Sequence, residues 1–181
     1  MANTPSARER LLVAATKVVS DVGAGHLTLD RVAEAAGVSK GGLLYHFASK
    51  RELIQAMTAE VLAEFQTKIE DKIEETDGTD NVRLVAVIKV MQERSASEKL
   101  RLRALLAASA ENPELLEPAK VVLKNHFDEI EDEATDADLA LTILLAVEGI
   151  RFMELFELLP LKHKEVNRML EKLLEMCTSS R

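Results

Sequence analysis

Residues 28–53 read TLDRVAEAAGVSKGGLLYHFASKREL, and the order of residues in this stretch decides the fold. Thr28 and Ser39 are residue types that commonly cap helix N-termini, and each stands just before an apolar-periodic segment. Gly37 lies between the two segments, where a residue without a side chain permits the chain to turn. Ser49 and Glu52 have the spacing of a capping box, which marks another helix start. The stretch therefore predicts two short helices, a tight turn between them, and a third helix directly after.

The second of these helices has two distinct faces. Leu43 and Phe47 are four residues apart and should be buried together. Tyr45 and His46 lie on the other side, and Gly41 with its neighbour Gly42 removes bulk from the exposed first turn. This is the helix-turn-helix arrangement, whose second helix enters the major groove of DNA.

Each polar residue of this segment suits a particular DNA contact. The capping hydroxyls and the lysines suit phosphates, a lysine also suits a base edge, and the rings of Tyr45 and His46 suit a sugar or a thymine methyl group. The alternative for each is a solvent-exposed residue without a role. The DNA-contacting residues predicted from these properties are Thr28, Ser39, Lys40, Gly41, Gly42, Tyr45, His46 and Lys50.

Charge is divided unevenly along the chain. The net charge is −8, from 23 basic and 31 acidic residues. Residues 1–50 hold six basic and four acidic residues, a balance of +2, and the remainder balances at −10. Because salt screens charges beyond about 8–10 Å, an acidic remainder does not prevent a locally basic segment from binding a polyanion.

The composition predicts an all-α fold of about nine helices. Aromatic residues make up 3% of the chain, which has only 7 glycines and 4 prolines; few turn formers and abundant Ala, Leu, Glu and Lys favour helices. Capping boxes at Ser6 and Ser95 mark further helix starts, and residues 77–80 mark a break. A helix over about residues 53–75 should link the two parts of the chain. An apolar helix that includes residues 139–147 should end at Pro160.

Several protein classes are excluded by what the sequence lacks. There is no apolar run long enough to span a membrane and no secretion signal. The single cysteine, Cys177, fits a reducing compartment, so we expect a cytoplasmic protein. No catalytic triad, metal-binding pair or phosphate loop is present, and we expect no enzymatic activity, no metal and no cofactor.

Residues 8–53 resemble the DNA-binding head of the TetR family of bacterial transcriptional regulators. The resemblance covers about a quarter of the chain, and the remainder is similar in architecture only. At the position of Leu44 the family usually has an aromatic residue that contacts DNA, so the resemblance adds Leu44 to the predicted DNA-contacting residues, limited to apolar contact such as a thymine methyl group. The matching positions are Thr28, Val32, Ala33, residues 36–41 (AGVSKG), Leu43, residues 45–47 (YHF), Ser49, Lys50 and Leu53.

The resemblance implies a division of labour between two domains. Residues 6–52 would form the helix-turn-helix domain, and residues 53–181 would bind a small effector and dimerise through the last two helices. The predicted effector-pocket residues are Met91, Phe127, Glu148, Phe152 and Phe156, with ordinary core packing as the alternative. The predicted dimer-interface residues are Leu144, Val147, Arg151, Val166, Met169, Leu170, Leu173 and Leu174.

The resemblance also implies a function. We expect a repressor that binds a palindromic operator as a homodimer and is released by a small-molecule effector. The alternative is a TetR-like DNA-binding protein with no small ligand, whose body is a platform for other proteins.

Overall fold

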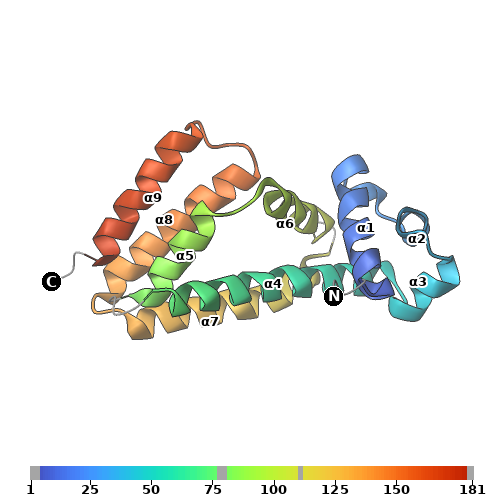
Figure 1. The fold of residues 1–181 in the computed structure, drawn as a ribbon, viewed down its shortest axis with the longest axis horizontal. Helices are drawn as coiled ribbons and strands as arrows, with labels where there is room; N and C mark the ends of the chain where they lie inside the picture. The colour runs from blue at the N-terminus through green and yellow to red at the C-terminus, as the bar shows by residue number, and fades with distance from the viewer. Residues whose placement is uncertain (1–4, 77–80, 110–111, 179–181) are drawn as a thin grey trace. The chain divides into compact units, whose positions relative to one another are not determined.

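The computed structural model describes residues 5–76, 81–109 and 112–178. Over these ranges the chain forms nine α-helices, two short 3-10 helices and no strand (Figure 1), which confirms the predicted all-α fold. The break expected at residues 77–80 lies outside the described residues. The chain divides into two compact units, Met1–Leu62 with Leu100–Ala119, and Ala63–Lys99 with Lys120–Arg181.

The first unit is built around three short helices and the beginning of a long one. Its core includes the fully buried side chains of Leu11, Leu12, Val32, Leu43 and Leu53, together with Phe47, over whose ring the Arg8 guanidinium lies at 5.4 Å. Leu105 and Leu115 also belong to this core. The elements are α1 (Ala7–Val22), η1 (Ala24–His26), α2 (Leu29–Ala36), α3 (Lys40–His46), the start of α4 (Lys50–Glu74), the later part of α6 (Ala96–Ser109) and η2 (Pro113–Leu116).

The turn between α2 and α3 is closed by backbone hydrogen bonds. Gly37 has φ 66°, in the left-handed region that favours glycine. The N–H of Val38 donates to the Ala33 carbonyl at 2.9 Å, and the N–H of Gly37 donates to the Glu34 carbonyl at 3.1 Å. Ser39 then caps α3, because its Oγ accepts from the N–H of Gly42 at 3.0 Å. The predicted helix end and helix start are both confirmed.

Two of the three predicted capping boxes form as expected, and the third has a different hydrogen-bond partner. Ser6 with Glu9, and Ser95 with Glu98, form the full reciprocal pair of hydrogen bonds. At the start of α4, the Ser49 Oγ accepts from the N–H of Glu52, but the Glu52 carboxylate accepts from the N–H of Ala48 at 2.9 Å. In a full capping box the Glu52 carboxylate would accept from the N–H of Ser49. Here it accepts from the preceding residue, Ala48, and so links the start of α4 to the residues that follow α3.

The second unit surrounds a separate apolar core. Its fully buried side chains include Ile69, Leu84, Ile88 and Ile130, which come from three different helices. Arg83 links three of its helices through ion pairs with Glu70 at 3.0 Å, Glu129 at 3.4 Å and Glu133 at 3.2 Å. Its elements are the end of α4, α5 (Val82–Gln92), the beginning of α6, most of α7 (Glu117–Glu133), α8 (Ala137–Leu155) and α9 (His163–Thr178).

The end of α8 corrects one expectation. The helix ends at Leu155 instead of continuing to Pro160. Glu157 adopts a left-handed conformation with φ 55°, and the N–H of Leu158 donates to the Met153 carbonyl at 2.9 Å. This bonding pattern closes the helix C-terminus before the proline is reached. A glutamate at the left-handed position gave no signal in the sequence.

The turn can be tested by two matched glycine substitutions. Gly37→Ala should destabilise the protein by about 1 kcal/mol, because alanine is strained at φ 66°. Gly41→Ala should be neutral or slightly stabilising, because a Cβ there meets nothing within 4 Å and alanine favours the helix. Chemical denaturation measures both. Equal stability of the two variants would show that the turn does not depend on Gly37.

Candidate functional site

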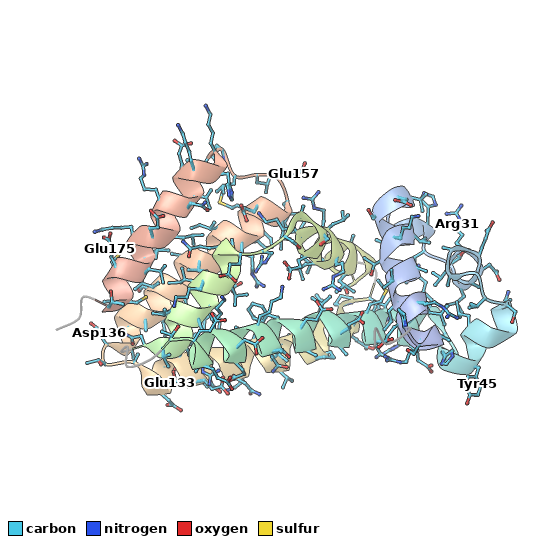
Figure 2. The ribbon with its side chains drawn as sticks, viewed as in Figure 1. Arg31, Tyr45, Glu133, Asp136, Glu157 and Glu175 are labelled. Atoms are coloured by element: carbon cyan, nitrogen blue, oxygen red, sulfur yellow. The ribbon has the colours of Figure 1, made fainter. Side chains whose placement is uncertain are left out.

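The outward face of α3 presents the residues predicted to contact DNA. Leu43 and Phe47 point into the core, whereas Tyr45 and Gly41 lie on the opposite side of the helix. Tyr45 is 86% exposed and points away from the ribbon in Figure 2. Of the nine predicted residues, seven are exposed, and His46 and Lys50 are half-buried. All nine therefore have surface available to a ligand.

Two of these residues are caps with a free hydroxyl hydrogen. Thr28 Oγ1 accepts from the N–H of Arg31 at 3.3 Å, and Ser39 Oγ accepts from Gly42. A hydroxyl that accepts a hydrogen bond still has its own O–H to donate. Both side chains are exposed. The same groups that fix the helix starts can therefore donate to an anion such as a phosphate.

Lys40 forms an ion pair with a neighbouring side chain, and Tyr45 and His46 contact each other. The Lys40 ammonium lies 2.9 Å from a carboxylate oxygen of Asp30, with both side chains largely exposed. An exposed pair of this kind contributes little stability, so it exchanges readily for another anion. The Tyr45 and His46 rings meet edge to face, with centroids 5.1 Å apart. This contact restricts the orientation of the tyrosine on the exposed face.

The predicted effector-pocket residues do not come together. Met91 is buried in the core of the second unit, and Phe127 is partly buried against it. Phe152 and Phe156 are 57% and 45% exposed and pack on each other with ring centroids 4.7 Å apart. In the single chain both phenylalanines are therefore exposed to solvent, and their assignment to an effector pocket stays a prediction. The fifth residue, Glu148, is paired with Arg151.

Half of the predicted dimer-interface residues have little surface exposed in the protomer, and the assignment of the whole set stays a prediction. The side chains of four of them are buried in the protomer's own core and have no surface left to bury against a partner. These are Leu144, Val147, Val166 and Leu170. Of the others, Met169 is exposed, and Arg151, Leu173 and Leu174 are half-buried.

A different apolar stripe is exposed on α8. Leu145 is 60% exposed and shares a face with Gly149, Phe152 and Phe156, at helical spacings of four, three and four residues. On α9, Met169 and Met176 are exposed. Figure 1 shows α8 and α9 as neighbours in the second unit. Sequence reasoning missed Leu145 because residues 139–147 are apolar on every side, although the spacing of Leu145, Phe152 and Phe156 was a usable signal.

The interior of the second unit contains buried polar atoms that the sequence did not reveal. Within the described residues, Nη1 of Arg94 and Nε2 of His126 are buried and have no hydrogen-bond partner. The His126 ring packs against Phe65, with centroids 5.7 Å apart. Burial lowers the pKa of His126, and the nearby Arg83 charge lowers it further against the opposing effect of Glu129, Glu148 and Glu70. The imidazole is therefore neutral at pH 7.

The second unit also contains a surface hollow and a single buried cysteine. A surface hollow with a volume of about 10 Å³, room for about one water molecule, is lined by Asn81, Asp136 and Met176, among others. It is smaller than the roughly 300–1,000 Å³ of typical ligand pockets and includes none of the predicted pocket residues. Burial raises the pKa of Cys177 to about 11, so this thiol stays protonated. Across residues 5–76, 81–109 and 112–178, no group of three or more His, Cys, Asp or Glu residues could hold a metal ion.

No helix in the described part of the chain is both long enough and apolar enough to cross a membrane.

The fold and the exposed face of α3 define a helix-turn-helix protein of the DNA-binding class. Two family models identify it further. Residues 11–57 match the model for bacterial regulatory proteins of the tetR family, and residues 83–178, more than half of the chain, match the tetracyclin repressor-like C-terminal domain. The chain belongs to the TetR family and is a transcriptional regulator.

The chain is also similar to individual proteins, in sequence or in fold. The HTH-type transcriptional regulator SrpR of Pseudomonas putida is 38% identical over 58 residues, which are 32% of this chain and only 27% of SrpR. A putative TetR-family regulator from a Rhodococcus species has the same fold, with a TM-score of 0.75 and 20% identity over 95% of this chain and 98% of that one. The multidrug binding protein EbrR, solved with ethidium, gives a TM-score of 0.67 at 21% identity, covering 94% and 99% of the two chains.

The buried His126 predicts a dependence of stability on pH. The depressed pKa means that the folded state takes up this proton less readily than the unfolded state. As the pH falls below about 6.5, the unfolded chain gains the proton first, and the free energy of unfolding decreases. The variant His126→Gln should lose part of this decrease. Urea denaturation between about pH 7.5 and about pH 5.5 measures it. An unchanged pH dependence in the variant would contradict the assignment.

Proposed function

We propose that this TetR-family regulator is a repressor that binds a near-palindromic operator as a homodimer. Residues 6–52 bind DNA, and residues 53–181 dimerise and bind a small effector that releases the operator. The observation that carries the proposal is the two-sided α3. Leu43 and Phe47 fix it in the core, and the opposite side exposes Gly41 and Tyr45. A regulator of chromosomal genes acts in the cytoplasm.

DNA binding divides the α3 residues by role. Gly41 and Gly42 allow the helix backbone to approach the groove closely. Tyr45, His46 and Leu44 reach bases or sugars, with Leu44 limited to apolar contact such as a thymine methyl group. Lys40 and Lys50 neutralise phosphates, and Lys40 leaves Asp30 to do so. Thr28 and Ser39 donate their hydroxyl hydrogens to the same backbone.

Dimerisation uses the exposed stripe of α8 with the exposed side of α9. The stripe, defined by Leu145, Gly149, Phe152 and Phe156, is apolar along more than two turns. An exposed apolar surface of this kind marks an interaction site. A second copy of the same stripe is its complement, because a two-fold axis places identical patches against each other. Gly149 has open space beside it and permits two helices to approach.

Effector release follows from the connection between the two parts. Helix α4 runs from Lys50 to Glu74 and contributes residues to both compact units. An effector bound in the second unit that shifts α4 would change the separation of the two heads of a dimer. Half-sites one DNA turn apart tolerate only one separation, so a small shift costs affinity. EbrR, which has the same fold, was solved with ethidium bound.

Substitutions on α3 and at the start of α4 test the DNA-binding surface. Tyr45→Ala and Lys50→Ala should each weaken binding to the operator by about tenfold, and Lys50→Ala should also lower the salt dependence by about one counterion. The melting temperature should stay nearly unchanged, since neither side chain is buried. Fluorescence anisotropy on the DNA upstream of the protein's own gene measures both quantities.

The matched control is Lys124→Ala, which removes an exposed lysine of α7 that is paired with Asp128. It should leave operator binding unchanged. Wild-type affinity in the Tyr45 and Lys50 variants would place the DNA surface elsewhere.

A charge in the α8 stripe tests the dimer. Leu145→Glu should yield monomers, because two unpaired carboxylates would face each other across the two-fold axis. Folding should survive, since Leu145 is exposed in the protomer. Light scattering gives the mass, and operator affinity should fall with the dimer. The control, Val121→Glu, makes the same kind of change at an exposed position of α7 and should remain dimeric. A dimeric Leu145→Glu protein would reject this interface.

A further inference from the structure

Arg94 is the least satisfied charged group in the described part of the second unit. It follows the end of α5 and is half-buried, with Nη1 inaccessible to solvent and without a hydrogen-bond partner. A buried donor without an acceptor is costly, more so when it belongs to a charged group. Arg83 shows the alternative in the same unit, since its guanidinium is paired with three carboxylates. The structure therefore leaves one arginine of this unit without the acceptor that it requires.

The carboxylates near Arg94 are already engaged. Glu148 pairs with Arg151 on α8, and Glu154 lies 2.9 Å from the Lys99 ammonium. The side chains of both pairs are mostly buried. Burial lowers the pKa of Arg94 to about 10, and the charge of Arg151 lowers it further, whereas Glu148 and Glu154 oppose this effect. The two carboxylates that act on Arg94 are thus each paired with another cation.

A second unpartnered atom lies in the same electrostatic neighbourhood. Nε2 of His126, on α7, is buried without a hydrogen-bond partner, and its Nδ1 is 3.8 Å from a carboxylate oxygen of Glu129. The charge of Glu148 acts on both His126 and Arg94. The Phe65 ring, packed on His126, supplies an apolar neighbour. The unit therefore has two buried, unpartnered polar atoms, Nη1 of Arg94 and Nε2 of His126, and one of them has an apolar ring beside it.

We propose that the second unit binds a carboxylate-bearing small molecule, whose carboxylate accepts a hydrogen bond from Nη1 of Arg94. This inference rests on the proposed function, because it gives the chemical class of the effector. The ligand's negative charge pairs with the Arg94 guanidinium, whose neighbouring carboxylates are engaged with other cations. A cationic ligand supplies no acceptor for Arg94 and is repelled by its guanidinium, so the site favours anions. A guanidinium matches a carboxylate in geometry as well as charge.

The experiment compares ligands that differ only in the head group. Octanoate and benzoate are the probes, and octanamide and benzamide are neutral controls of the same size. A ligand that binds only the folded protein raises its melting temperature. At about 10 mM, both carboxylates should stabilise the wild-type protein measurably, and the amides should not. No stabilisation by either carboxylate, or equal stabilisation by the amides, would overturn the proposal.

Three variants then locate the contact. Arg94→Met should weaken carboxylate binding about tenfold or more, and Arg94→Lys should retain part of it, because a lysine keeps the charge and loses the planar fork. Arg10→Met makes the same change at an exposed arginine of α1 and should bind as the wild type does. Unchanged binding by Arg94→Met would overturn the proposal.

The ligand-free variants separate this role from a structural one. Arg94→Met should have a melting temperature equal to or above that of the wild type, because it removes an unpartnered buried donor. A lower melting temperature together with a weaker dimer would mean that a partner copy supplies the anion, and that result would overturn the proposal. Operator binding is measured in parallel. If the wild type binds DNA but no carboxylate, this inference alone fails; if it binds no DNA, the proposed function fails.

Discussion

The burial of Leu43 and Phe47 is the contact on which the DNA-facing surface depends. Helix α3 has only seven residues, too few to be stable alone, so its orientation comes from tertiary packing. Leu43 is fully buried and Phe47 nearly so, and each such side chain contributes about 1.5–3 kcal/mol. Because side chains four residues apart share a face, fixing these two directs Tyr45 and Gly41 outward. The left-handed Gly37 and the Ser39 cap then set where α3 begins.

Two arginines of the second unit, Arg83 and Arg94, differ in how their charges are paired. Arg83 stabilises the contact of three helices because three carboxylates satisfy it. Arg94 lacks such partners, so its burial suits a unit that gains an anion in one of its states. Helix α8 supplies residues to the core, to the polar groups near Arg94 and to the exposed apolar surface. It buries Ile143, Leu144 and Val147 in the core, carries Glu148 and Arg151 among the polar groups, and exposes Leu145, Phe152 and Phe156.

The sequence predicted those features that depend on local chemistry. Thr28, Gly37 and Ser39 act through neighbouring backbone groups, so their residue types alone indicate caps and turns. The features that it missed depend on residues distant in the chain. The apolar run over residues 139–147 has no polar side from which its orientation can be read, so the sequence could not show that Leu144 is buried in the protomer and Leu145 is exposed. Arg94 has no distinctive neighbours in sequence, and only its burial identifies it.

The most direct test of the account is a footprint of the full-length protein on DNA from upstream of its own gene. At low salt, a dimer with two copies of α3 should protect two related half-sites whose centres lie about one helical turn, roughly 34–36 Å, or a multiple of it apart. Protection should disappear in the Leu145→Glu protein. A footprint limited to one half-site, or no protection at low salt, would contradict the conclusion that paired α3 helices read an operator.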